Sequence, residues 1–276
     1  MSKTESKVAE HYTNGALQAT IESGWAKLRT VSDVAPIDQL AGVDEFHIGG
    51  RFATEYVCER MDLTPGLKVL DLGCGLGGAA RFMATRYGVD VEGIDLTREY
   101  VEVGNRLTLE VGLEKKVRLT QASALDLPHE DRSFDRISQF HVGMNIQDKD
   151  KLLAEVVRVL KPGGVYVVYD VMRVGDGELE YPVAWAQDES TSFVSHIDDY
   201  KDAISKVGLS LQHTESQKDM ALEFFARMKA RMAESGPPPL GLHIVMGQDA
   251  AVKVKNMVAN IAKGAIAPVL MVARKT

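Results

Sequence analysis

A cluster of glycines preceded by an acidic residue is the part of the sequence best suited to chemistry. Gly73, Gly75 and Gly78 follow the apolar run VLDL, and a helical pattern begins directly after them. Glycines let a ligand approach the backbone closely and permit a positive φ at the turn. The N-terminus of the next helix would present unpaired N–H groups to a carboxylate or a phosphate. Residues 71–78 are therefore predicted to be a ligand-binding loop.

The glycine spacing alone leaves two classes of cofactor open. It also fits the GxGxxG pattern of dinucleotide sites, so a nicotinamide-dependent oxidoreductase is a competing hypothesis. Asp71 stands two residues before the first glycine. A carboxylate there gives nothing to a pyrophosphate, whereas it could hold the ammonium group of a methionine moiety. Asp95 lies where a ribose-binding acid is expected, about 20 residues past the loop, and serves either cofactor. Asp71 thus favours S-adenosylmethionine over NAD.

The loop needs a scaffold of parallel strands, and the hydrophobic pattern predicts one. Apolar runs alternate with helical patterns along most of the chain. Strands are predicted at residues 68–73, 89–96, 116–125, 134–140, 165–172, 209–217 and 267–275. Helices are predicted at residues 79–88, 98–113, 148–160, 198–208, 220–235 and 248–264. This alternation implies an α/β, doubly wound sheet, interrupted by a lid-like insertion at 173–195.

Four phrases in order along residues 69–170 resemble class I S-adenosylmethionine-dependent methyltransferases: VLDLGCGLGG, EGIDLT, SALDLPHEDRSFDRI and RVLKPGGVYVVYD. The resemblance implies a Rossmann-like, seven-stranded, mostly parallel sheet whose last strand is antiparallel. It also implies that Ser123 occupies a position at the adenine edge that is often Asp. The cofactor-binding residues expected on this basis are Asp71, Gly73 and Gly75 at the methionine end, Asp95 and Leu96 at the ribose, Ser123 and Ala124 at the adenine, and Gln139.

The N-terminal region carries a narrower resemblance. Tyr12 and the phrase FHIGGR at 46–51 are similar to the N-terminal cap of the sarcosine and dimethylglycine methyltransferase group. By that likeness Tyr12 and His47 would close over the cofactor, although a lone His is commonly a structural donor and an N-terminal Tyr often only packs. We expect residues 1–45 to form a cap of two short helices, 46–172 the S-adenosylmethionine-binding core, and 173–276 the lid insertion and the completion of the same domain.

The methyl acceptor is expected beyond the fourth strand, because ligands bind at the carboxyl ends of strands in such sheets. His141 could act there as a general base, but transfer to a neutral amine requires only an aligned nucleophile. We therefore predict that His141 is catalytic and that the N-terminal segment and the insertion form the acceptor pocket. Aromatic residues of the insertion could instead be a hydrophobic lid packed on core helices. The predicted substrate-binding residues are Met144, Asn145, Tyr181 and Trp185.

Composition limits the remaining possibilities. The net charge is -7, and 45% of the residues are hydrophobic, as in an ordinary globular protein. The basic residues are scattered, so no nucleic-acid partner is expected. Cys58 and Cys74 have no metal-ligand spacing, and no apolar run is long enough to span a bilayer, so we expect no metal, no stable membrane association and a cytoplasmic location. The oligomeric state is left open, with a homodimer as one option.

The function expected from the sequence is S-adenosylmethionine-dependent methyl transfer to the N or O atom of a small-molecule acceptor, with S-adenosylhomocysteine as the product. Two alternatives remain at this point. One is the NAD-dependent oxidoreductase that the glycine pattern permits. The other is a protein that keeps the fold and the cofactor site but has no catalytic activity.

Overall fold

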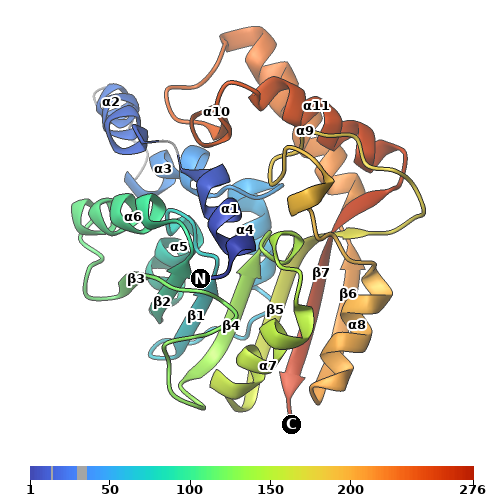
Figure 1. Cartoon of the computed structure of the whole chain (residues 1–276). Helices are drawn as coiled ribbons and strands as arrows, with labels where there is room; N and C mark the ends of the chain where they lie inside the picture. The colour runs from blue at the N-terminus through green and yellow to red at the C-terminus, as the bar shows by residue number, and fades with distance from the viewer. Residues whose placement is uncertain (14, 30–35) are drawn as a thin grey trace.

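A single seven-stranded sheet runs through the protein, with helices on both of its faces (Figure 1). The computed structural model describes residues 1–13, 15–29 and 36–276. The strands are β1 (Lys68–Leu72), β2 (Asp90–Asp95), β3 (Val117–Gln121), β4 (Phe134–Phe140), β5 (Leu160–Arg173), β6 (Leu209–Ser216) and β7 (Ile266–Lys275).

The strand order is β3-β2-β1-β4-β5-β7-β6. Neighbours among the first five strands pair in parallel, while β7 pairs antiparallel with both β5 and β6. The predicted fold class, including the antiparallel last strand, is therefore confirmed. The order reverses between β1 and β4, and a crevice at the carboxyl ends of strands is expected at such a switch point.

Eleven α-helices are assigned within the described ranges, together with two short 3-10 helices. The α-helices are α1 (Lys3–Tyr12), α2 (Leu17–Arg29), α3 (Pro36–Asp44), α4 (Gly50–Cys58), α5 (Gly78–Tyr87), α6 (Arg98–Glu110), α7 (Lys149–Val159), α8 (Ile197–Lys206), α9 (Lys218–Ser235), α10 (Leu242–Met246) and α11 (Ala250–Ala262). Helices α9, α10 and α11 lie over the carboxyl ends of the parallel strands (Figure 1). None of the described helices has both the length and the apolar composition of a membrane span.

The alternation of side chains along the strands explains why helices pack on both faces of the sheet. In β5, Val165 and Val167 pack into one buried cluster with α4 and α5, whereas Tyr166 and Val168 pack into another with α7 and α8. Successive side chains of a strand point to opposite faces. An uninterrupted apolar run therefore supplies both cores at once, as expected for a parallel sheet buried on both sides.

The N-terminal region differs from its prediction of two short helices. Three helices, α1 to α3, are described there, and the predicted cap also includes residues 14 and 30–35, which lie outside the described residues. Helix α2 starts just after Gly15, whose φ is +78°. The backbone N–H groups of Gly15 and Leu17 donate to the Glu99 carboxylate of α6 at 3.0 and 3.2 Å. The start of α2 is thus stabilised by a contact with the distant helix α6, which a local sequence pattern does not reveal.

A buried arginine joins the N-terminal region to the core. Arg81 of α5 is fully buried, and its Nη2 donates to Asp44 Oδ2 and to the Leu76 carbonyl, both at 2.7 Å. Its Nη1 donates to the Gly104 carbonyl at 3.1 Å and to Thr108 Oγ1 at 2.9 Å. The side chains of Asp44 and Arg81 are both 0% exposed. One guanidinium thus holds α3, α5, α6 and the loop after β1 together.

Removal of this guanidinium should strongly destabilise the fold. We expect Arg81→Ala to lower the free energy of unfolding by about 3 to 5 kcal/mol, because Asp44 would remain buried without its ionic partner. Urea denaturation followed by circular dichroism measures the change. Arg86→Ala is the matched control, since Arg86 is exposed in the last turn of the same helix. Equal stability of the two variants would contradict the role assigned to Arg81.

Candidate functional site

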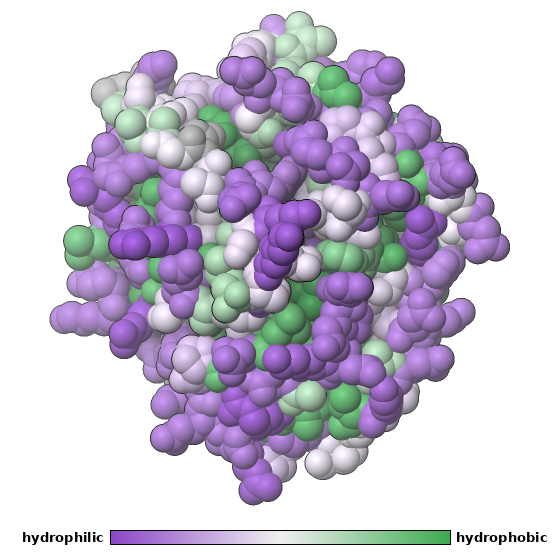
Figure 2. Space-filling model, in the orientation of Figure 1, coloured by the Kyte–Doolittle hydropathy of each residue, from purple (hydrophilic) through white to green (hydrophobic). Residues whose placement is uncertain are grey.

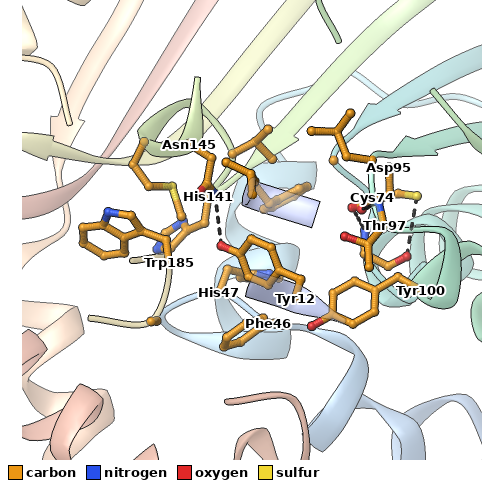
Figure 3. A pocket seen from close by; sticks show the side chains of 18 of the residues that line it. Tyr12, Phe46, His47, Cys74, Asp95, Thr97, Tyr100, His141, Asn145 and Trp185 are labelled. Atoms are coloured by element: carbon orange, nitrogen blue, oxygen red, sulfur yellow. Dashed lines mark hydrogen bonds between the residues drawn. The ribbon is translucent and has the colours of Figure 1, made fainter. Parts of the chain in front are cut away.

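A cavity of about 390 Å³ lies at the carboxyl ends of β1, β2 and β4, beneath α1 and α9 to α11. Thirteen residues predicted from the sequence line it: Tyr12, His47, Asp71, Gly73, Gly75, Asp95, Leu96, Ser123, Ala124, His141, Met144, Asn145 and Trp185. Figure 3 shows Tyr12 between two groups of side chains. Asp95, Thr97 and Tyr100 lie on one side of it, and His141, Asn145 and Trp185 on the other.

Two glycines of the loop shape one end of this cavity. Gly73 has a φ of +67°, and a Cβ there would lie 2.2 Å from Val142 Cγ2. Gly75 has a φ of +53°, but a Cβ there would meet only Tyr100, at 4.0 Å. The first glycine is therefore required by the packing of the protein itself. At the second, the space that a side chain would occupy is left for a ligand that approaches the backbone.

Asp71 is an acid held at the floor of the cavity. Its side chain is 2% exposed, and Oδ1 accepts a hydrogen bond of 2.7 Å from Ser138 Oγ of the neighbouring strand β4. Burial raises the pKa of Asp71 to about 7, although the bond from Ser138 opposes the shift. A carboxyl group in this state gains from a cation placed beside it, because the cation favours the ionised form.

Asp95 sits at the end of β2 with both carboxylate oxygens oriented by the backbone. Gly75 N donates to Oδ2 at 2.9 Å, and Thr97 N donates to Oδ1 at 2.8 Å. Burial raises the pKa of Asp95, and these backbone bonds oppose the rise. Asp95 lines the cavity, and a carboxylate can accept about four hydrogen bonds in all. The arrangement suits a pair of neighbouring hydroxyl groups, as in a ribose.

The N-terminus of α5 is not open to a pyrophosphate. A Cβ on Gly78 would lie 2.4 Å from the Asp44 carbonyl oxygen and 2.6 Å from Asp44 Oδ1. Helix α3 therefore covers the end of α5 that a dinucleotide would use, and it places a carboxylate there. Because Asp44 already occupies the space at this helix end, the contact disfavours the NAD hypothesis.

The adenine edge contains a residue that the sequence did not suggest. Ser123 Oγ donates a very short hydrogen bond to Glu5 Oε1 of α1, and it accepts one of 3.0 Å from Leu125 N. Glu5 lines the cavity and also completes the capping box at the start of α1. A carboxylate is thus present at this edge, but it comes from the N-terminal helix and not from the loop after β3. The capping pattern accounts for Glu5 locally, so no second role was apparent from the sequence.

Tyr12 and Asn145 form a polar pair in the middle of the cavity. Asn145 Nδ2 donates to the Tyr12 hydroxyl at 3.0 Å. Asn145 Oδ1 is buried and has no hydrogen-bond partner within the described part of the chain. Burial raises the pKa of Tyr12, so its hydroxyl stays protonated and can donate in turn. This pair lies where the two halves of the cavity meet (Figure 3).

Two neutral histidines line the wall behind Tyr12. His47 Nε2 lies 3.1 Å from the Gly50 carbonyl oxygen, and burial lowers the pKa of His47 to about 3. His141 Nδ1 lies 3.1 Å from the Tyr169 carbonyl oxygen, and its Nε2 accepts a bond of 3.4 Å from Ile48 N. Burial lowers the pKa of His141 to about 4. Both imidazoles are therefore uncharged at neutral pH, and both nitrogens of His141 are engaged.

Two predicted site residues lie outside the cavity lining, so their assignment to it was wrong. Gln139 is fully buried on the other face of β4, where Nε2 donates to the Tyr200 hydroxyl at 2.9 Å and Oε1 accepts from Tyr166. Side-chain alternation explains this, since the preceding Ser138 points toward Asp71. Tyr181 packs against the apolar cluster formed with α9 and α11. From the same insertion, Trp185 does line the cavity, and its Nε1 donates to Ser192 Oγ at 2.9 Å.

The largest omission of the sequence prediction is the contribution of α9, α10 and α11. It assigned the acceptor pocket to the N-terminal segment and the insertion, yet these three helices supply much of the apolar wall. Their lining residues are Phe224, Phe225, Leu242, Val245, Met246, Val254 and Met257. The sequence predicted helices at 220–235 and 248–264, but only the folded arrangement shows which of their side chains face the cavity.

Comparison with known proteins identifies the core. Residues 69–164 match the family described as "Methyltransferase domain". The chain contains a methyltransferase domain. Methyltransferase GfsG of Streptomyces halstedii is 36% identical to the chain over 177 residues, which are 62% of this chain and 63% of GfsG. The match therefore spans less than two thirds of the length of that relative.

Solved structures share the fold beyond the methyltransferase domain. Geranyl diphosphate C-methyltransferase from Streptomyces coelicolor A3(2) superposes with a TM-score of 0.74 at 18% identity and covers 100% of this chain and 98% of its own. A putative sarcosine dimethylglycine methyltransferase from Galdieria sulphuraria gives a TM-score of 0.66 at 24% identity, over 81% of this chain and 85% of its own. The predicted superfamily and fold class are confirmed.

The raised pKa of Asp71 predicts a pH-dependent affinity for a ligand with an ammonium group. Above its pKa of about 7 the carboxylate attracts the ammonium, and below it the neutral acid does not. We expect S-adenosylhomocysteine to bind up to about tenfold more weakly at pH 6 than at pH 8, the factor for one pKa unit. Calorimetric titration at both pH values measures this. Asp71→Asn should bind weakly with little pH dependence; the same pH dependence in this variant would show that another group titrates.

Proposed function

We propose that the chain transfers the methyl group of S-adenosylmethionine to a nitrogen or oxygen atom of a small molecule. The proposal depends mainly on one observation: a buried carboxylate, Asp71, and a half-buried one, Asp95, flank a glycine loop at one end of the cavity. One acid suits the ammonium of an amino-acid moiety, and the other suits a ribose diol. Solved methyltransferases of this fold were obtained with S-adenosylhomocysteine or S-adenosylmethionine, in agreement with the cofactor predicted from the sequence.

The chain's own residues account for how such a cofactor would be held. Asp95, fixed by Gly75 N and Thr97 N, can accept from both ribose hydroxyls without reorientation. Glu5 and Ser123 can face the exocyclic amine of the adenine. The bound cofactor supplies a methyl group activated on a sulfonium sulfur. The task of the protein is to align the acceptor atom with that methyl group and to exclude water.

Tyr12 occupies the boundary between the two ends of the cavity. It belongs to α1, so closure of this helix over the loop also places the Tyr12 hydroxyl beside Asn145. We infer that the acceptor lies on the Asn145 side and that the reacting atom meets the methyl group near Tyr12. His141 and Met144 line this side as well. The names of the relatives include both carbon and nitrogen methyltransferases, for example sterol 4-C-methyltransferase and ajmaline N-methyltransferase. Transfer to nitrogen or oxygen in this chain is therefore part of the proposal.

The direct test is an acceptor screen scored by release of S-adenosylhomocysteine, with amines, acids and phenols as acceptors. We expect release with at least one class and none without acceptor. Asp95→Ala should weaken S-adenosylmethionine binding by roughly 1 to 3 kcal/mol, the cost of lost bonds to a charged partner. Tight NAD(H) binding with no response to S-adenosylmethionine would refute the proposal. Cofactor binding with no release from any acceptor would favour a catalytically silent protein.

A second experiment addresses His141, for which we propose a role in turnover. His141 has a φ of +53°, a conformation that Asn tolerates better than Ala. We expect His141→Asn and His141→Ala to lower turnover at least about a hundredfold, the lower end of the range for acid–base groups, with S-adenosylhomocysteine affinity unchanged. Steady-state kinetics and calorimetry separate the two effects. Recovery of activity in the Asn variant alone would indicate that His141 only supports the backbone; full activity of both variants would exclude it from the reaction.

A further inference from the structure

The end of the cavity beyond Tyr12 is almost entirely hydrocarbon. Phe224 and Phe225 of α9 and Val254 and Met257 of α11 line it and share one apolar cluster with Met144 and with Trp185 of the insertion. By contrast, the outer face of the molecule in Figure 2 is mostly hydrophilic. Large apolar surface directed into a cavity stabilises the binding of apolar ligands, because it is removed from water when they enter.

The charges around the cavity are of one sign. Among the described residues that line it there are five acids and neither Lys nor Arg; the acids are Glu5, Asp44, Asp71, Asp95 and Asp148. Cations behind the lining are already engaged: Arg81 pairs with Asp44 at 2.7 Å, Lys149 Nζ donates to the Phe193 carbonyl at 2.9 Å, and Lys253 Nζ donates to the Met246 carbonyl at 3.0 Å. Within the described ranges, no group of acidic, His or Cys side chains is arranged to hold a metal ion.

An anionic acceptor would therefore be poorly accommodated. A phosphate, diphosphate or carboxylate taken from water into this cavity would meet acids and hydrocarbon with no countercharge. The cost of burying an unpaired charge is large. A cationic sulfonium, by contrast, would gain from the same acidic surroundings.

A neutral amide with a free acceptor interrupts the apolar wall. Asn145 Oδ1 is buried and has no hydrogen-bond partner among the described residues, while its Nδ2 donates to the Tyr12 hydroxyl. Buried acceptors are nearly always satisfied in native proteins. Because Nδ2 is committed, the free oxygen can be satisfied only by a donor that enters the cavity.

We propose that the methyl acceptor is a largely apolar, uncharged molecule that carries one O–H or N–H group, which donates to Asn145 Oδ1. This inference rests on the proposed function and specifies the acceptor class for the same site. The hydrocarbon part lies against α9 and α11, and the donor group is held next to Tyr12, at the boundary with the cofactor end. The donor is either the reacting group or its neighbour, and in both cases binding requires no countercharge.

The test uses the full chain saturated with S-adenosylhomocysteine and three probes with the same tail: para-hexylphenol, para-hexylanisole and para-hexylbenzoate. Calorimetry should give the tightest binding for the phenol. We expect the anisole, which lacks the donor, to bind at least about fivefold more weakly, and the benzoate at least about tenfold more weakly. In Asn145→Leu the preference for the phenol over the anisole should disappear.

A pair of charge variants on α11 supplies the control. Val254→Lys places a cation in the apolar end and should reverse the preference, so that the benzoate binds more tightly than the phenol. Val252→Lys, on the exposed side of the same helix (Val252 is 48% exposed), should leave all three affinities unchanged. Benzoate binding equal to or tighter than phenol binding in the unmodified protein, or no phenol binding, would overturn the inference. Failure of S-adenosylhomocysteine itself to bind would instead refute the proposed function.

Discussion

The buried ion pair between Arg81 and Asp44 is the constraint on which the site depends. The guanidinium lies beneath the glycine loop and binds the Leu76 carbonyl of that loop, Asp44 of α3 and two groups of α6. Loop, cap and core therefore cannot take up their positions separately. Asp44, brought into place by this pair, also covers the start of α5. The same contact that stabilises the fold thus determines which ligands the loop can accept.

A cavity lined by acids and neutral histidines follows from this arrangement. Burial raises the pKa of Asp71 to about 7, and it lowers the pKa values of His47 and His141. Near neutral pH the imidazoles are uncharged, and the acids gain from a cation. A methyl donor with a positively charged sulfonium meets acids of the opposite charge. The walls beyond Tyr12 contribute mainly apolar surface.

The order of strands and helices could be predicted from the sequence, because the core strands are apolar runs that alternate with helical patterns. The loop residues could also be predicted, because the turn requires glycines. Asp95 could be predicted from its spacing after the loop, where a ribose-binding acid is expected. Glu5, Arg81 and Tyr100 could not be predicted, because their roles arise from contacts with residues far away in the chain. Gln139 was predicted to face the cofactor, but successive side chains of a strand alternate between faces, and its side chain points to the other face of β4. Helices α9 and α11 were predicted, but which of their side chains face the cavity depends on how the helices cross the sheet.

The two ends of the cavity come from different stretches of the chain. The loops after β1, β2 and β3, together with α1, build the end with the carboxylates, whereas residues from 184 onward build most of the hydrocarbon end. Both are supported by the carboxyl edge of one rigid sheet. Substitutions in the last third of the chain can therefore remodel one compartment while the other keeps its shape, which gives the scaffold a simple route to diversify during evolution and a defined region for library design.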